Sequence, residues 1–223
     1  MSELRARKKP IQERSRATVE AILEASLRVL VDVGFDKLTT TRVADVAGVG
    51  VGTLYQYFPS KESLLYALLE EQMAALEDAL LGAMAGSEGQ SLEARVAAVI
   101  DALVVLKRRS VHVTLHGYLD QIDGRRVVKK TMRKITSGIA SMIAPHVIAT
   151  DAELELIAQV VASSIQGAIE AVLDNTPGTL AKPSFRDALV KLTLGYLRES
   201  GCDFGPRRKA PSTRGSERRR STA

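Results

Sequence analysis

The sequence predicts an all-α fold in which a small N-terminal helical unit precedes a larger helical domain. Apolar residues recur at the three- and four-residue spacing of amphipathic helices along most of the chain. No alternating run of apolar and polar residues is bounded by the dipeptides that form tight hairpins, so strands are not expected. With 45% hydrophobic but only 4% aromatic residues, the core has to be built from Leu, Val, Ile, Ala and Met.

Four helices are predicted in the first third of the chain. An apolar stripe predicts a helix over residues 16–33, which Gly34 ends. Thr39 is the expected N-cap of a short helix over residues 40–47, and Gly48 ends that helix. A second short helix is expected over residues 51–57. Ser60 then caps a helix that starts at Lys61 and ends near residue 82.

Five further helices are predicted after residue 90. Thr150 and Glu153 form a capping box at the start of one of them, and Ser184 with Asp187 is expected to open the last. The segment between these two helices reads as a loop. The predicted helices are Ser91–Arg109, Val111–Leu119, Arg125–Val147, Asp151–Leu173 and Ser184–Glu199.

Positive charge is concentrated at the two ends of the chain. Residues 1–16 carry a net charge of +4 and residues 207–223 a net charge of +6, whereas the interior carries −5. We expect residues 1–14 to be a disordered basic arm and residues 206–223 to be a disordered basic tail. Such tails either attract nucleic-acid phosphates without reading sequence or are merely solvated, and the sequence leaves both interpretations open.

Cysteine content and hydropathy favour a cytoplasmic protein without a membrane partner. Cys202 is the only cysteine, so an intramolecular disulfide is excluded. The basic N-terminal residues are not followed by the apolar stretch of an export signal. The run from Val96 to Leu106 is interrupted by Asp101 and is too short to span a bilayer.

The two short helices around Gly48 have the spacing of a helix-turn-helix, in which the first helix braces the second against the DNA major groove. Gly48 can adopt the left-handed backbone that the sharp turn requires. Apolar residues on both helices are expected to pack them together: Val43, Ala44, Val46, Val49 and Leu54.

The remaining positions of this unit carry side chains suited to nucleic acid. Hydroxyl, phenol and ammonium groups bind phosphates, whereas Gln and Arg can pair with base edges. Two glycines keep the start of the second helix slim. The candidate DNA-binding residues are Thr39, Thr40, Thr41, Arg42, Gly50, Val51, Gly52, Thr53, Tyr55, Gln56, Tyr57 and Lys61.

The stretch AGVGVGTLYQYFPSKESLL closely resembles the pattern AGVS-x-GTLY-x-YF-x-SKE-x-LL of the TetR/AcrR family of transcription regulators, and the similarity extends from about Ile22 to Leu65. The resemblance implies about nine helices, with a DNA-binding domain over residues 15–60 and a ligand-binding and dimerisation domain over residues 61–205. It implies phosphate contacts by Thr39, Thr40, Tyr55, Tyr57 and Lys61, and base contacts by Arg42, Thr53 and Gln56.

Two positions depart from the family pattern. Gly50 stands where the family usually has Ser, so the second short helix loses a capping hydroxyl, a change worth roughly a few tenths of a kcal/mol. Arg42 stands where the family often has Glu, so a capping box with Thr39 is lost and a cation is placed near the DNA.

The resemblance also implies that the last two long helices form a four-helix bundle across a two-fold axis. A symmetric dimer is needed to read two half-sites about 34–36 Å apart. The alternative is that both helices pack only within their own subunit. The candidate interface residues are Ile157, Val161, Ile165, Ala168, Leu192 and Tyr196.

The other helices are candidates to enclose a largely apolar effector, because Met adapts to varied shapes and His or Tyr can orient a polar group. A plain apolar core is the alternative for each position. The candidate pocket residues are Met73, Leu76, Leu103, Leu106, His112, His116, Tyr118, Met132 and Ile135.

Two other clusters are weaker signals. His112 and His116 are spaced to share a metal ion, but no zincin motif is present and no metal or other cofactor is expected. The basic residues Arg125, Arg126, Lys129, Lys130, Arg133 and Lys134, like the block Lys107–Arg109, form either a solvated face or a site for an anionic ligand.

These observations predict a sequence-specific repressor that binds operator DNA as a homodimer and is released by a small molecule. An activator, or a repressor without an effector, is the first alternative. A non-specific architectural protein that uses its basic tails is the second. No nucleophile motif, phosphate loop or metal cluster points to an enzyme.

Overall fold

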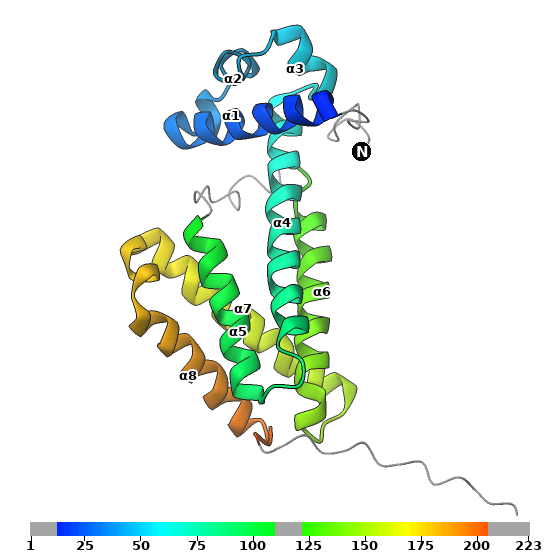
Figure 1. Cartoon of the computed structure of the whole chain (residues 1–223), viewed down its shortest axis with the longest axis vertical. Coiled ribbons are helices and arrows are strands. Elements are labelled where there is room, and N and C mark those ends of the chain that lie inside the picture. Colours follow the sequence, from blue (N-terminus) through cyan, green and yellow to red (C-terminus); the bar gives the residue numbers. More distant parts are fainter. Residues whose placement is uncertain (1–12, 110–121, 205–223) are drawn as a thin grey trace, which may run out of the picture.

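The computed structural model describes residues 13–109 and 122–204. Within these ranges it consists of α-helices and two short 3-10 helices, in agreement with the predicted all-α class. Figure 1 shows an elongated molecule in which α1 (Glu13–Lys37), α2 (Thr40–Ala47) and α3 (Val51–Tyr57) form a small head at one end. The other helices form a larger body. The predicted helix over 111–119, with His112, His116 and Tyr118, lies outside the described residues.

The helix α1 continues past its predicted end at residue 33. Gly34 has φ 74° and ψ 171°, so it interrupts the helical backbone as expected, but a further short helical stretch follows it. Phe35 and Leu38 are buried after this kink, and the Leu38 amide donates to the Phe35 carbonyl at 3.1 Å. The kink therefore turns the chain so that it closes the core of the head.

The helix α4 (Lys61–Gly86) connects the head to the body. Leu64, Leu65 and Leu68 are buried in the head core, whereas Leu76 and Leu80 are buried in the body core, so α4 crosses the boundary expected after residue 60. Residue 82 does not end the helix, because Met84 packs into the body one half-turn later. The helix ends at Ser87, whose hydroxyl donates to the Ala83 carbonyl at 2.7 Å.

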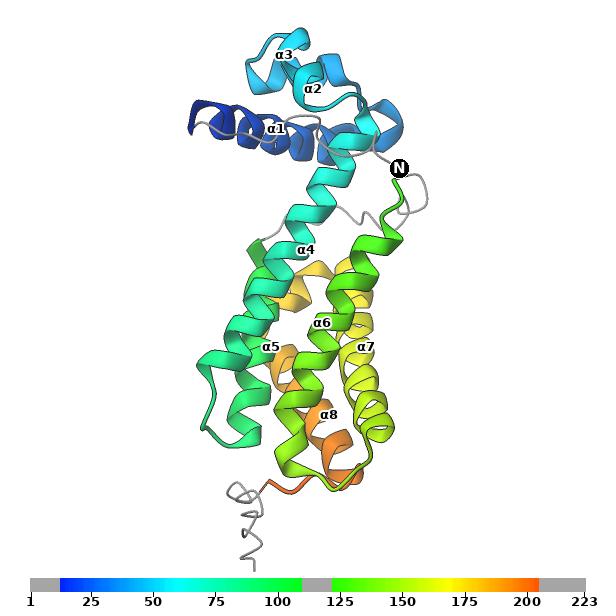
Figure 2. The ribbon, with the colours of Figure 1, turned by 90° about the vertical axis from the view of Figure 1, so that its right-hand side faces the viewer.

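The body is a ring of five helices: α4, α5 (Leu92–Arg109), α6 (Arg125–Ile143), α7 (Asp151–Asn175) and α8 (Pro183–Glu199). The helix α4 packs against α5 and α6, α6 packs against α7, and α8 packs against both α5 and α7. Figure 2 shows α6 and α7 side by side. Aliphatic side chains from all five helices fill the interior.

Several helix ends differ from the prediction. Pro145 lies in the 3-10 helix η2 (Ala144–His146), so α6 ends at Ile143 rather than at Val147. The expected loop contains a second 3-10 helix, η3 (Pro177–Ala181). The last helix begins at Pro183 after Lys182, without a side-chain cap, because proline at the first helical position needs no amide partner. The predicted Ser184 cap is therefore wrong.

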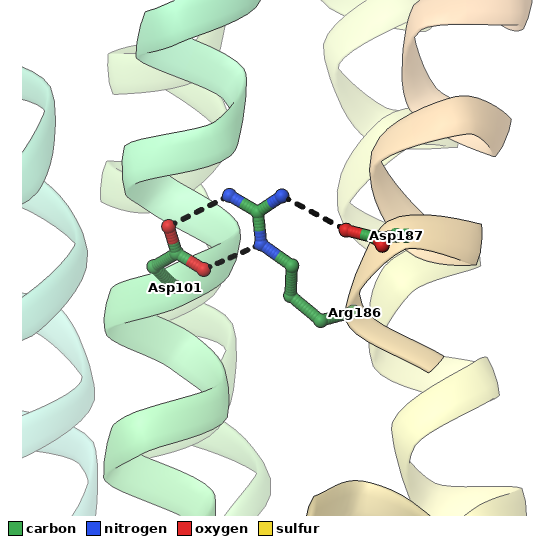
Figure 3. A network of polar contacts seen from close by, with 3 residues as sticks. All are labelled: Asp101, Arg186 and Asp187. Carbon is green, nitrogen blue, oxygen red and sulfur yellow. Dashed lines mark hydrogen bonds and ion pairs between the residues drawn. The ribbon is translucent and has the colours of Figure 1, made fainter. Parts of the chain in front are cut away.

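Two arginines link helices of the ring through hydrogen bonds. Arg95, on α5, is buried and directs its guanidinium to the carbonyls of Met84 and Met142, at 3.4 Å each, near the C-terminal ends of α4 and α6. Arg186, on α8, donates to both carboxylate oxygens of Asp101 on α5, at 2.7 and 2.8 Å, and to Asp187 at 3.1 Å (Figure 3). The Arg186 guanidinium lowers the pKa of Asp101.

Candidate nucleic-acid interface

The short helix α3 has one face in the core and one face in solvent. Leu54 is fully buried, and Val51 packs partly against the same core. Gly52 and Gln56 are exposed, and the Tyr55 side chain remains 45% exposed. The exposed face therefore presents a glycine, an amide and a phenol at the outer end of the head (Figure 1).

The turn between α2 and α3 holds this face in place. Gly48 has φ 67° and ψ 29°, the left-handed conformation predicted for it, and its amide donates to Asp45 at 3.2 Å. Val43 and Ala44 are fully buried in the head core. A hydrogen bond of 2.9 Å between the Thr40 hydroxyl and the Tyr55 phenol joins the two helices at the surface.

One predicted packing residue faces solvent. Val46 is 46% exposed, although it was expected to pack between α2 and α3. Its neighbours Val43 and Ala44 are the fully buried residues of α2. Val46 lies about half a turn from Ala44, on a side of the helix that the head core leaves in solvent. The expectation for Val46 is therefore wrong, whereas Val49 is partly buried against the head core.

The start of α2 places three polar residues at the surface. The Thr39 hydroxyl accepts a hydrogen bond from the Arg42 amide at 3.2 Å, as predicted for the N-cap. Thr41 and the side chain of Arg42 are exposed. Gly50, at the start of α3, makes no side-chain cap.

The last two candidate residues are less exposed than the sequence suggested. Tyr57 is partly buried against the head core. The ammonium of Lys61 lies 4.2 Å from the centroid of the Phe35 ring, an attractive cation–π arrangement. Both side chains therefore border the exposed face, and the head core restrains each of them.

The candidate pocket residues that the structure describes belong to the body. Leu76, Leu103 and Ile135 are buried in the body core, and Met73, Leu106 and Met132 pack partly buried against it. Met73 also contacts the head core. In the described ranges, no group of three His, Cys, Asp or Glu side chains is arranged to hold a metal ion.

The candidate dimer residues differ in how far they are buried within the chain. Ile157, Val161 and Ile165 are buried in the core of their own subunit, and Ala168 and Tyr196 pack partly against it. Of the six, only Leu192 is well exposed, at 51%. The apolar stripe that predicted the interface is the inward face of α7, because the body core also needs an apolar stripe from this helix.

The outward face of α7 carries a large apolar residue, Leu156, that the sequence interpretation did not select for the interface. Leu156 is 61% exposed, and the small residues Ser163, Gly167 and Ala171 follow it on the same face. By length and composition alone α7 could cross a membrane. Only 28% of its most apolar window is buried inside the structure, so the other helices of the body leave most of this window uncovered. The small residues Ser163 and Gly167, which allow helices to approach closely, mark this face in the sequence.

Two family models match the chain. Residues 22–68 match the model for bacterial regulatory proteins of the tetR family, and residues 91–197 match the model for tetracyclin repressor-like C-terminal domains. The first match begins within α1, includes α2 and α3 and ends early in α4, and the second runs from the start of α5 almost to the end of α8.

Curated relatives match part of the chain. It is 35% identical over 69 residues to the HTH-type transcriptional regulator YvdT of Bacillus subtilis, covering 31% of this chain and 36% of YvdT. It is 26% identical over 121 residues to the HTH-type transcriptional regulator BetI of Escherichia coli, covering 48% of this chain and 62% of BetI. The chain thus spans between about a third and three fifths of the length of these relatives.

Solved structures share the whole fold. A transcriptional regulator from Rhodococcus superposes with a TM-score of 0.65 at 18% identity, covering 84% of this chain and 99% of its own. The regulator LfrR of Mycobacterium smegmatis, solved in complex with proflavine, superposes with a TM-score of 0.57 at 19% identity, covering 82% and 97%. With the two family models and the exposed helix-turn-helix, this shows that the chain belongs to the TetR family of bacterial transcriptional regulators.

Proposed function

We propose that this chain is a cytoplasmic repressor that binds its operator as a homodimer and leaves it when a small molecule binds the body. The observation that carries the proposal is the exposed face of α3, with Gly52, Tyr55 and Gln56, above a buried Leu54. Because Leu54 anchors α3 in the head core, the exposed side of α3 is held in position for contact with another molecule. Gln56 is positioned to read a base edge, and Tyr55 to bind a phosphate.

The dimer would form through the outward faces of α7 and α8. Leu156 on α7 and Leu192 on α8 are the large apolar residues exposed there, and the exposed Ser163 and Gly167 would allow helices to approach closely. Covering the apolar surface of α7 with the same surface of a second subunit gives a symmetric interface. A double variant, Leu156→Asp with Leu192→Asp, should be monomeric by light scattering, whereas Val105→Asp on α5 should stay dimeric.

The release step would run through the start of α6. Ile122, just before α6, is buried in the head core, and Val127 and Val128 on α6 pack partly against the same core. A ligand that shifts α6 within the body would therefore move the head. The ligand can lower operator affinity only if it binds the conformation with the shifted α6 more tightly than the conformation that binds DNA.

The first test is fluorescence anisotropy with DNA from upstream of the coding sequence, in the presence of random competitor. Gln56→Ala should weaken specific binding by about tenfold, since one good base contact is worth about 1–3 kcal/mol. The matched control Gln90→Ala removes an exposed amide from the turn after α4 and should bind like the unmodified chain. Equal binding to all DNA by every variant would instead favour the architectural use of the basic tails.

A further inference from the structure

The helix α6 has an apolar side and a basic side. Ile135, Ile139 and Met142 are buried in the body core. The opposite side carries four exposed cations, which together form the basic stripe: Arg126, Lys129, Lys130 and Arg133. Their spacing of three and four residues places them on one face of the helix. The helix contains no aspartate or glutamate, so no carboxylate of its own offsets this charge.

The basic stripe has no partner within the described part of the chain. The next cation along α6, Lys134, contacts the Glu77 carboxylate of α4 at 2.5 Å. In residues 13–109 and 122–204, by contrast, no side chain of the basic stripe forms an ion pair or a hydrogen bond. Like charges three or four residues apart on a helix repel one another. A partner that carries repeated negative charge would relieve this repulsion.

The basic stripe begins beside the head and runs away from it. Ile122, just before α6, is buried in the head core. Figure 1 and Figure 2 show that α6 extends from there along the body, and that α1 lies between the start of α6 and the helices α2 and α3. A straight duplex on the exposed face of α3 therefore does not reach the basic stripe.

The chemistry of the basic stripe favours nucleic acid over a lipid surface, although both are anionic. A helix that lies on a membrane inserts apolar side chains among the lipids. The apolar side of α6 is not available for this, because it is buried in the body core. The phosphates of a nucleic acid, in contrast, are neutralised by Lys and Arg alone. The four cations span about 10 Å of helix, at a rise of about 1.5 Å per residue, and form a row along which a phosphate backbone can lie.

We propose that the basic stripe of α6 is a second DNA-binding surface, which holds the phosphate backbone of a duplex segment other than the one bound by the head. The contact is independent of base sequence, because Lys and Arg contacts to phosphates carry no sequence information. A subunit bound to its operator through the head would thereby hold a second stretch of DNA against its body. This inference goes beyond the proposed function, of which it needs only operator binding by the head.

The test attaches the full-length chain to beads through its N-terminus and saturates it with unlabelled DNA from upstream of the coding sequence. A fluorescent duplex of random sequence is then titrated onto the beads. Lys129→Gln with Arg133→Gln should weaken capture of this duplex by about tenfold. It should also reduce the slope of log affinity against log salt by about two, since each phosphate contact contributes about 0.9. Binding of the upstream DNA should be unchanged.

Two matched variants separate the basic stripe from net charge and from helix structure. Arg108→Gln with Lys182→Gln removes the same number of exposed cations from elsewhere in the body, and should capture the random duplex like the unmodified chain. Lys129→Arg with Arg133→Lys keeps both charges on α6 and should also retain capture. Circular dichroism of each variant establishes that it is folded.

The proposal is overturned if the unmodified chain captures no random duplex, or if Lys129→Gln with Arg133→Gln captures it equally well, because the basic tails would then hold it. Equal losses in the two charge-removing variants would also overturn it. So would a stripe that is needed for binding to phosphatidylglycerol vesicles but not to the random duplex. Failure of the unmodified chain to bind the upstream DNA would refute the repressor function and leave the comparison of variants on the random duplex standing.

Discussion

The head and the body differ in what determines which side of a helix is buried. In the head, α3 has seven residues, and Leu54 and the exposed Gln56 take opposite sides because only one side meets the core. In the body, α7 has 25 residues with apolar or small side chains on more than one side, and contact with the other helices of the ring decides which stripe faces inward. The orientation of a short helix with one apolar side can be predicted from its sequence, whereas that of a long helix with two apolar sides cannot.

The largest expected effect tests whether the head has an independent core. Phe58→Ala removes a ring that is only 1% exposed and should cost about 3–5 kcal/mol. Operator binding should be lost, while circular dichroism and chemical unfolding should retain a body transition. The control Val46→Ala, at an exposed position of α2, should cost less than about 0.5 kcal/mol. If Phe58→Ala unfolds the whole chain in one step, the head and body are a single cooperative unit joined by α4.

The sequence predicted the parts of the molecule that depend on near neighbours. Thr39 caps α2, Gly48 makes the left-handed turn, and Thr150 with Glu153 forms the predicted capping box, with the Glu153 carboxylate 2.8 Å from the Thr150 amide. Each of these features needs only residues within a few positions of one another. The caps and the turn were therefore readable from spacing alone.

The features that the sequence did not predict depend on residues far away in the chain. Ile157 and Val161 were expected at the dimer interface, but both are buried in the body core of their own subunit. Gly82 was expected to end α4, but the helix continues to Gly86, and Met84 beyond the glycine is buried in the body core. Periodicity shows that a stripe is apolar, and it does not say which partner covers the stripe.

A second prediction concerns the close contact of α4 and α6 within the body. A Cβ atom on Gly138 would lie 2.8 Å from Leu81 Cδ2 and 3.0 Å from Met84 Sδ. Gly138→Val should therefore lower the free energy of unfolding by about 1–3 kcal/mol through overpacking. Gly82→Val, where a Cβ meets nothing within 4 Å, should be nearly neutral. If the two variants have equal free energies of unfolding in urea, α4 and α6 can move apart without loss of stability, and the prediction is wrong.

A third prediction concerns the link between α5 and α8. Because the Asp101 and Arg186 side chains are 52% and 32% exposed, Asp101→Asn should cost less than about 1 kcal/mol at neutral pH. The pKa of Asp101 is lowered in the folded chain, so its contribution is fully present above the ordinary carboxyl pKa of about 3.9 and is lost progressively as the pH falls from there through the lowered folded-state pKa.

The measurement is the difference in unfolding free energy between the unmodified chain and Asp101→Asn at pH 7 and pH 3. The difference should be smaller at pH 3 than at pH 7, and smaller again at high salt. Asp78→Asn removes an exposed carboxylate from α4 as a control for net charge. A difference of the same size at both pH values would show that Asp101 acts through packing rather than through its charge.

The smallest expected effect returns to the head. Gly50 has φ −65° and ψ 142°, a backbone open to any residue, and an added Cβ would meet only Thr53 Oγ1, at 3.8 Å. Gly50→Ser can therefore supply the side-chain cap that α3 lacks, and should raise stability by a few tenths of a kcal/mol, roughly. Gly52→Ser is equally open but lies inside the helix, where serine cannot cap its start. If both variants stabilise the chain equally in urea, the gain comes from restricting a glycine backbone rather than from the cap.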